Sequence, residues 1–130
     1  MSQIHCVVVT PEQMALEADA DFVSLPLYDG EIGIAPGHSP MIGRLGYGEL
    51  RLKTQAAERR FYLDGGFVQV ADDVVSVLTD RAIPAEKIDT NAARQQLAEA
   101  MTRPINTPEL LEARDRLVAQ ARAQLQVAGK

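Results

Sequence analysis

The composition of the chain changes at residues 83–84, and this change limits the possible fold more than any other feature. Eight of the nine glycines precede it, together with short runs of valine and isoleucine that are typical of strands. The segment after it has a single glycine, Gly129, and is rich in alanine, leucine, glutamine and arginine, which favour helices. We therefore expect a β domain over residues 1–83 and a helical domain over residues 84–130.

Eight short segments of the first domain are expected to be strands, because turn residues separate them. They are Ile4–Val9, Asp21–Leu27, Glu31–Ala35, Met41–Arg44, Gly48–Lys53, Arg60–Leu63, Gly66–Ala71 and Val74–Leu78. Tight turns between neighbouring strands imply antiparallel pairing. The pattern predicts two packed sheets or a flattened barrel. The imperfect alternation of residues 67–71 predicts a strand inside the sandwich.

The second domain is expected to form two helices joined by a short connection. Apolar residues recur at helical spacing over residues 88–101, where Asp89 is the expected N-cap. A second helix is expected over residues 108–127, with Thr107 as its N-cap and Pro108 in its first helical position. The short connection predicts an antiparallel helical hairpin.

Composition argues against several classes of protein. The net charge of −5 and the absence of tryptophan disfavour a nucleic-acid binder. A lone cysteine, Cys6, cannot form an intrachain disulfide, and with two histidines it cannot complete a zinc site, so we expect it to be a core residue and expect no metal. The sequence shows no signal peptide and no membrane-spanning run, which predicts a cytoplasmic chain that only partners could hold at a membrane.

Residues that could carry catalysis are few. His38 stands beside Ser39 between two prolines, but adjacent residues of an extended loop point apart, which favours a structural or interface role. The run Asp64-Gly65-Gly66 is not followed by the lysine and helix of a phosphate-binding loop, and a hairpin turn is the better interpretation. We therefore expect an adaptor or regulator with no catalytic and no cofactor-binding residues, rather than an enzyme that uses His38 with nearby acids.

Several blocks of the sequence resemble one protein family. The run DGEIGIAPGHSP over residues 29–40 is similar to the signature loop of the ε subunits of F-type ATP synthases. The blocks GYGELRL (46–52), FYLDGGFVQV (61–70) and VVSVLTDRA (74–82) agree with that family in order and spacing. The resemblance covers nearly the whole chain. It implies an α+β, mainly β fold: an antiparallel two-sheet β-sandwich followed by a C-terminal α-helical hairpin.

The resemblance also implies a function. Members of the family are non-catalytic subunits of the central stalk, bound to the γ subunit and resting on the c-ring, and they couple ring rotation to γ during proton-driven ATP synthesis. The implied location is the cytoplasmic face of a bacterial inner membrane, reached through the complex. In bacterial members the hairpin can extend along γ and inhibit ATP hydrolysis.

Five residues are assigned to partners on this basis. Glu31 and His38 are carried over as contacts with the c-ring; the alternative is a solvated acid and a histidine that braces its loop. The second helix has a basic bias, so we expect Arg114, Arg116 and Arg122 to contact acidic segments of the catalytic β subunits of the α/β assembly in the extended state. Ordinary solvated helix charges are the alternative.

One departure from the family concerns nucleotide binding. Some members bind ATP through an I-D-x-x-R-A motif at the start of the first helix. Here the stretch over residues 88–94 reads IDTNAAR, with Ala92 in place of the arginine and Arg94 about 200° further round a helix. Without that phosphate partner we expect the hairpin not to bind ATP.

Overall fold

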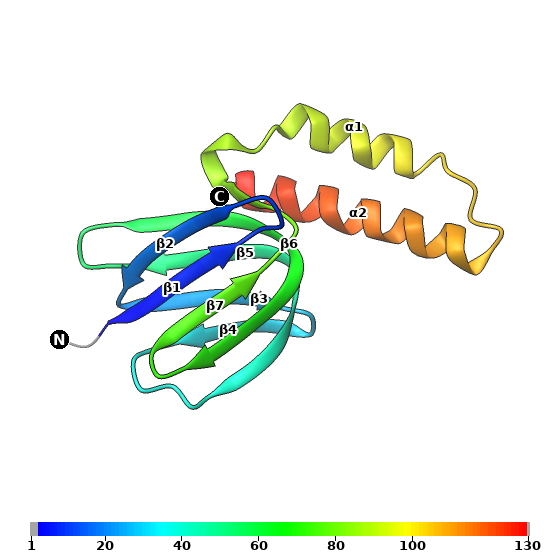
Figure 1. The fold of residues 1–130 in the computed structure, drawn as a ribbon. Coiled ribbons are helices and arrows are strands. Elements are labelled where there is room, and N and C mark those ends of the chain that lie inside the picture. Colours follow the sequence, from blue (N-terminus) through cyan, green and yellow to red (C-terminus); the bar gives the residue numbers. More distant parts are fainter. Residues whose placement is uncertain (1–2, 130) are drawn as a thin grey trace.

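Eight strands precede two helices along the chain (Figure 1), and the structure, a computed structural model, describes residues 3–129. The strands are β1 (Ile4–Val9), β2 (Met14–Ala20), β3 (Phe22–Leu27), β4 (Gly30–Ile34), β5 (Met41–Lys53), β6 (Glu58–Ala71), β7 (Val74–Leu78) and β8 (Ala82–Pro84). A 3₁₀ turn (Ala85–Lys87) leads to α1 (Thr90–Ala100) and α2 (Pro108–Ala128). The predicted order, a mainly β domain followed by two helices, is confirmed.

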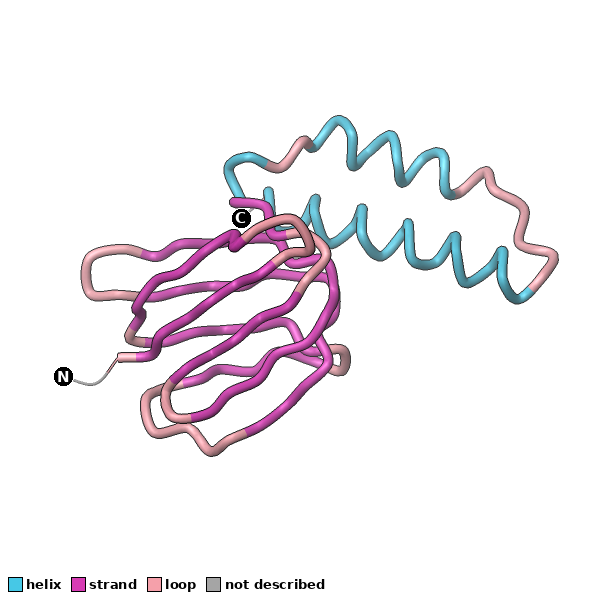
Figure 2. The backbone as a smooth tube through the Cα atoms, viewed as in Figure 1, coloured by secondary structure: helices cyan, strands magenta, loops and turns pink. Residues whose placement is uncertain are grey.

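The strands form a continuous hydrogen-bonded path that folds over into two facing layers (Figure 2). Its order is β2-β1-β7-β6-β5-β3-β4, with β8 added to β6. The strands β5 and β6 are 13 and 14 residues long, and each bends so that it contributes to both layers. This explains why the two expected sheets are joined, and why each pair of short strands predicted over residues 41–53 and 60–71 is one long strand.

Glycines explain why these long strands bend instead of ending. Gly66 has a φ of +110°, and a Cβ atom there would lie 1.8 Å from the carbonyl oxygen of Leu78. Only a residue without a side chain allows β6 to pass this close to the end of β7. The predicted turn at this point is therefore a bend within a strand.

Three further expectations about the strands were wrong. β2 and β8 were not predicted, because the MALEADA sequence of β2 has little intrinsic strand preference and β8 is three residues long. β1 and β7 are parallel, whereas antiparallel pairing was expected throughout. These two strands are far apart in sequence, so no tight turn dictates their direction.

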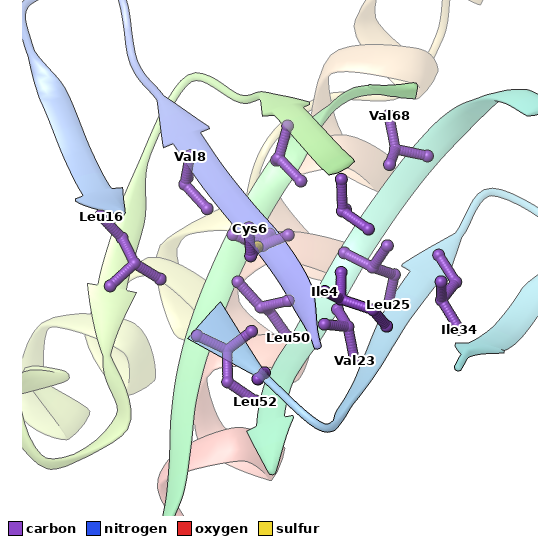
Figure 3. Packing of buried hydrophobic residues seen from close by; sticks show 14 of the residues in the cluster. Ile4, Cys6, Val8, Leu16, Val23, Leu25, Ile34, Leu50, Leu52 and Val68 are labelled. Carbon is purple, nitrogen blue, oxygen red and sulfur yellow. The ribbon is translucent and has the colours of Figure 1, made fainter. Parts of the chain in front are cut away.

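The core lies between the two layers and consists mainly of valine, leucine and isoleucine (Figure 3). Cys6 is fully buried there, and burial raises the pKa of its thiol to about 12, so it is a core residue as expected. Residues 67–71 alternate regularly, with Val68 and Val70 in the core and Phe67 exposed. This corrects the expectation of a strand buried on both faces.

The two helices lie antiparallel, and α2 is the one that packs on the sandwich, against β5 and β6 (Figure 1). Both predicted N-caps are confirmed: the Asp89 carboxylate accepts from the Ala92 amide at 3.0 Å, and the Thr107 hydroxyl accepts from the Leu110 amide at 3.2 Å. Pro108 occupies the first turn of α2. Within residues 3–129, neither helix combines the length and the hydropathy that crossing a bilayer requires.

Candidate functional site

The loop between β4 and β5 is fixed to a second turn at the same end of the sandwich. Gly37 has a φ of +84°, and its amide donates a 2.7 Å hydrogen bond to the carboxylate of Asp73, in the turn between β6 and β7. Asp73 itself has a positive φ of 62°. This bond holds the loop in one conformation although most of its residues are exposed.

His38 is half-buried in this loop, and its ring is anchored to the backbone. Its Nδ1 atom donates to the carbonyl oxygen of Ser39 at 2.7 Å, and its own amide donates to the carbonyl of Ala35. The Nδ1 atom thus serves the backbone and not the Ser39 hydroxyl. The arrangement fixes the direction of the imidazole edge, which suits a contact surface better than a serine–histidine pair.

Glu31 lies elsewhere, within β4 and not in the loop. Its carboxylate is exposed and stands 3.9 Å from the guanidinium of Arg51 on β5. From Glu31 to the end of β4 at Ile34 the strand rises roughly 10 Å, and the loop with His38 begins only there. The structure therefore places the two residues assigned to the ring in separate surroundings.

An exposed apolar surface, which the sequence did not lead us to predict, covers the outer face of β5, β6 and β7. We call it the outer patch and define it by Tyr28, Ile42, Arg44, Phe67 and Leu78. Ile42, Phe67 and Leu78 are 79%, 58% and 60% exposed. Arg44 is paired with Phe67 and Phe67 with Leu78 across the strands, and the Arg44 guanidinium lies 4.7 Å from the centre of the Tyr28 ring.

The outer patch borders an open groove of about 860 Å³. Besides Arg44, Phe67 and Leu78, it is lined by residues that follow β1 and β7, namely Thr10, Pro11 and Asp80 among others. Contiguous exposed apolar side chains with a polar border are typical of protein–protein interfaces. Arg44 and Asp80 are the charged residues of its lining, and Phe67 and Leu78 supply its large apolar side chains.

The regular alternation of β6 was the signal that could have revealed the outer patch. Residues 68 and 70 face the core, so residues 67 and 69 must face outward at a period of two. A phenylalanine at such an outward position, opposite Leu78 on the neighbouring strand, indicates an exposed apolar surface. This inference requires the pairing of β6 with β7, which the sequence segments alone do not provide.

The three arginines of α2 do not share one helix face. At 100° per residue, Arg116 and Arg122 lie about 200° and 80° from Arg114 around the axis. Arg116 and Arg122 are exposed, whereas Arg114 is half-buried and its guanidinium bonds the neighbouring Asp115 at 3.2 Å. In this conformation the arginines thus spread positive charge around the helix.

The start of α1 uses its polar groups for local structure. The Asp89 carboxylate is occupied as the N-cap, and the Arg94 guanidinium lies 3.4 Å from the side-chain oxygen of Asn91. Ala92 is exposed and offers no hydrogen bond to a phosphate. Over residues 3–129, no group of three or more acidic, histidine or cysteine side chains is arranged to bind a metal ion.

Comparison with known sequences gives one consistent result. Residues 3–85 match the family described as "ATP synthase, Delta/Epsilon chain, beta-sandwich domain". The chain is 55% identical to the ATP synthase epsilon chain of Rhodopirellula baltica over 122 residues, which cover 94% of this chain and 95% of that one. It is 34% identical to the ATP synthase epsilon chain of Nitratidesulfovibrio vulgaris strain DP4, over 95% of this chain and 88% of that one.

Solved structures share the fold. A chain in the cryo-EM structure of the Euglena gracilis mitochondrial ATP synthase (OSCP/F1/c-ring, rotational state 1) superposes with a TM-score of 0.87 at 22% identity, covering 100% of this chain and 83% of that one. A chain in the central stalk and c-ring of the Tetrahymena thermophila mitochondrial ATP synthase gives a TM-score of 0.72 at 15% identity, covering 98% and 97%. At these identities the similarity is one of architecture.

Proposed function

The chain belongs to the family of ATP synthase epsilon chains, and on that premise we propose that it is a non-catalytic rotor subunit of the central stalk. In this role it joins the γ subunit to the c-ring, at the cytoplasmic face of a bacterial inner membrane, during proton-driven ATP synthesis. Its two domains, residues 1–83 and 84–130, have different roles. The sandwich couples rotation of the c-ring to γ, and the hairpin restrains ATP hydrolysis. The observation that carries the proposal is the outer patch.

The outer patch is the surface that we assign to γ. Phe67 and Leu78 are large, exposed and paired across β6 and β7, and the exposed Ile42 lies on β5 opposite Gln69; full burial of one such side chain contributes about 1.5–3 kcal/mol. The backbone pairing of β5, β6 and β7 fixes the positions of these residues on the sheet, so no backbone rearrangement is needed when a partner covers them. A patch of this kind suits a partner that stays bound through many turns of the rotor.

We assign two contacts to the c-ring: His38 in the loop between β4 and β5, and Glu31 on β4. The bond from Gly37 to Asp73 restricts the loop, and the anchored ring of His38 presents a fixed polar edge. Glu31 lies further along β4 beside Arg51, so we propose that it contacts the ring separately from His38. Fixed polar groups favour specificity at a rim more than affinity.

Regulation of hydrolysis is assigned to the hairpin. We propose that in the extended state Arg114, Arg116 and Arg122 meet acidic segments of the catalytic β subunits. Because the three point in different directions, such contacts would involve more than one surface of the α/β assembly. Arg114 would first have to exchange Asp115 for its new partner.

The γ contact is tested by reconstitution of the chain with a γ-containing catalytic head. The variant Phe67→Asp places a charge in the centre of the outer patch and is expected to weaken binding roughly 10- to 100-fold. Met14→Asp is the matched control, because Met14 is also 58% exposed but lies on the edge strand β2. Equal binding of both variants would contradict the assignment.

The inhibitory role is tested in the same system by measuring ATP hydrolysis. A chain truncated after Pro84 is expected to release inhibition, and the triple variant Arg114→Ala, Arg116→Ala, Arg122→Ala is expected to release part of it. Unchanged inhibition by the truncated chain would remove the hairpin from the mechanism. Unchanged inhibition by the triple variant alone would remove only the arginines.

A further inference from the structure

We propose that the buried carboxylate of Asp64 is a polar latch that holds α2 against the sandwich and sets how readily the hairpin detaches. This inference rests on the proposed regulatory role and names the contact that such regulation has to break. It concerns the surface of β6 that α2 covers, where only a hairpin turn at residues 64–66 was expected.

Asp64 lies on β6 beneath α2, and its side chain is 7% exposed. One carboxylate oxygen, Oδ1, accepts from the Tyr62 hydroxyl at 2.8 Å and from the Gln120 amide at 3.0 Å. The other, Oδ2, accepts from Nε of Arg81 at 2.9 Å. A buried carboxylate is stable only when its lone pairs are occupied in this way. Three hydrogen-bond donors thus converge on this carboxylate, and one of them, Gln120, belongs to the hairpin.

Gln120 connects the latch to the rest of the hairpin. Its amide nitrogen donates to Asp64, while its oxygen accepts from the side chain of Gln96 on α1 at 3.4 Å. Gln96 also donates to the carbonyl oxygen of Leu117 at 2.9 Å. One chain of hydrogen bonds therefore runs from β6 through α2 to α1, so the position of both helices depends on it.

A second polar contact lies at the end of α2. The Arg60 guanidinium donates to the carbonyl oxygen of Val127 at 2.6 Å, and Nε of the same arginine donates to Glu49 at 2.7 Å. A cation at the C-terminal end of a helix interacts favourably with the exposed carbonyl groups there. Glu49 keeps Arg60 in place whether or not the helix is present, so this contact can be remade each time α2 returns.

The apolar part of the interface is small. Its buried members are Tyr62 of β6 with Ile88 and Val127 of the helical segment, and the partly buried residues packed against them are Tyr47, Ile83, Ala85, Ala123 and Ala128. The core of the sandwich contains many larger aliphatic side chains. The hydrogen bonds to Asp64 and Arg60 therefore add directional contacts to an apolar cluster that is smaller than the core of the sandwich.

The latch is suited to reversible opening because Asp64 keeps two of its hydrogen bonds when the helix detaches. When α2 leaves, the carboxylate retains Tyr62 and Arg81, both from the sandwich, and water can replace Gln120. The detached state therefore has no orphaned charge. In the docked state, by contrast, loss of the Gln120 donor leaves a buried acceptor site empty, which is costly.

The test is amide hydrogen exchange of the full chain without any partner, followed over α2 and over the strands. Gln120→Glu removes the donor and sets a second carboxylate against Asp64, and we expect exchange in α2 to rise at least about tenfold. The matched control is Gln95→Glu, which adds the same charge at an exposed position of α1. Exchange in the strands is expected to stay the same in both variants.

An exchange of partners sharpens the test. In the double variant Asp64→Asn, Gln120→Glu the amide and the carboxylate have changed places, so protection of α2 is expected to return toward that of the unmodified chain. The latch is wrong if Gln120→Glu leaves α2 exchange within about twofold of the control, or if the double variant is no better protected than Gln120→Glu. If circular dichroism shows that Gln120→Glu has lost helix content, the exchange measurement is made on Gln120→Met instead. This variant removes the donor without adding charge.

Hydrolysis assays separate this inference from the proposed function. If α2 exchanges faster in Gln120→Glu while inhibition of the reconstituted head is unchanged, the latch stands and the regulatory role of the hairpin fails. If α2 protection is unchanged, the latch fails whatever the inhibition. Faster exchange together with altered inhibition supports both.

Discussion

The sandwich and the hairpin are stabilised by different kinds of contact. The sandwich buries large aliphatic side chains from both layers, such as Ile4, Leu25 and Leu50, all fully buried. The two helices bury three alanines, Ala93, Ala100 and Ala121, together with Gln124 and Val127, and they also depend on their caps and on hydrogen bonds. The first arrangement is rigid because close-packed interiors resist rearrangement, while the second depends more on hydrogen bonds, which water can replace.

The difference follows from the sequence of each domain. Valine and leucine at alternate positions of a strand fill the space between two layers. Alanine at helical spacing lets two helices approach closely but removes little apolar surface from water. The two domains are therefore suited to different mechanical tasks.

The largest contrast is expected between core truncations in the two domains. Leu50→Ala should lower the free energy of unfolding by about 2–5 kcal/mol, because it leaves a cavity between the layers. Leu117→Ala removes the same atoms from a half-buried position of α2 and should cost less than half as much. Urea unfolding followed by circular dichroism measures both, and equal losses in the free energy of unfolding would contradict the contrast between the two domains.

A second contrast lies within the sandwich, between two glycines with positive φ. Gly66→Ala places a methyl group against the Leu78 carbonyl, whereas the space around Gly30 is open within 4 Å. Gly30→Ala should cost about 1–3 kcal/mol from backbone strain, and Gly66→Ala should cost clearly more. Thermal unfolding of the two variants is the measurement. A smaller loss for Gly66→Ala would show that β6 can move away from β7.

The N-cap of α2 tests the local stability of the hairpin. Thr107→Ala should destabilise the first turn of the helix by about 1 kcal/mol, because the Leu110 amide loses its acceptor. Hydrogen exchange should accelerate at the start of α2 and remain unchanged in the strands. Thr107→Ser keeps the hydroxyl and is the control; a strand response to Thr107→Ala would mean that the domains unfold as one unit.

A smaller, pH-dependent effect is expected in the sandwich. His5 on β1 lies 2.8 Å from Asp19 and 2.7 Å from Glu17 on β2, and hydrogen bonds to these two carboxylates raise the pKa of His5 above 6.5. A raised pKa in the folded state means that the stabilisation is complete below about pH 6.5 and is lost as the pH rises through the folded value. The chain should therefore unfold at lower urea at pH 8 than at pH 6.

His5→Gln is the control for this effect. It should reduce the difference between the two pH values, because the neutral side chain cannot gain or lose a proton in this range. Both histidines of the chain, His5 and His38, belong to the sandwich. If the difference persists in His5→Gln, the response does not arise from the bridge between β1 and β2.

The smallest expected effect is that of nucleotide on the hairpin. Asp89 is occupied as an N-cap and Ala92 offers no hydrogen bond to a phosphate, so ATP should leave exchange in α1 and α2 unchanged. Isothermal titration of the chain with ATP is the direct measurement. Binding below millimolar concentration would contradict this expectation. The stability of the hairpin relative to the sandwich would then have to be measured with and without nucleotide.

The parts of the fold that sequence predicted are those fixed by neighbours along the chain. Asp89, Thr107 and Pro108 act within one turn of helix, so their residue types were sufficient to place both helix starts. The segments Ile4–Val9 and Val74–Leu78, expected to be strands from their runs of valine, are β1 and β7 with the same bounds. The change in composition at residues 83–84 predicted a β domain followed by a helical hairpin, and the resemblance of several sequence blocks to a family implied a two-sheet sandwich rather than a flattened barrel.

What the sequence did not predict depends on pairing between distant segments. β2 is a strand because β1 lies beside it, and β1 runs parallel to β7 because the intervening chain is long enough to return. The outer patch and the latch are of the same kind: Phe67 meets Leu78, and Asp64 meets Gln120, only once the chain has folded. Contacts between distant segments leave no periodic pattern of residues, so a single sequence does not reveal them.

The bending of β5 and β6 through both layers has a consequence for how the sandwich responds to force. In a sandwich of two separate sheets, sliding one sheet over the other disturbs only side-chain contacts. Here the two layers share covalent backbone, because β5 and β6 belong to both. Shear between the layers would have to deform two polypeptide strands and the ladder of bonds between them, so the elastic stiffness of this domain arises from its main chain.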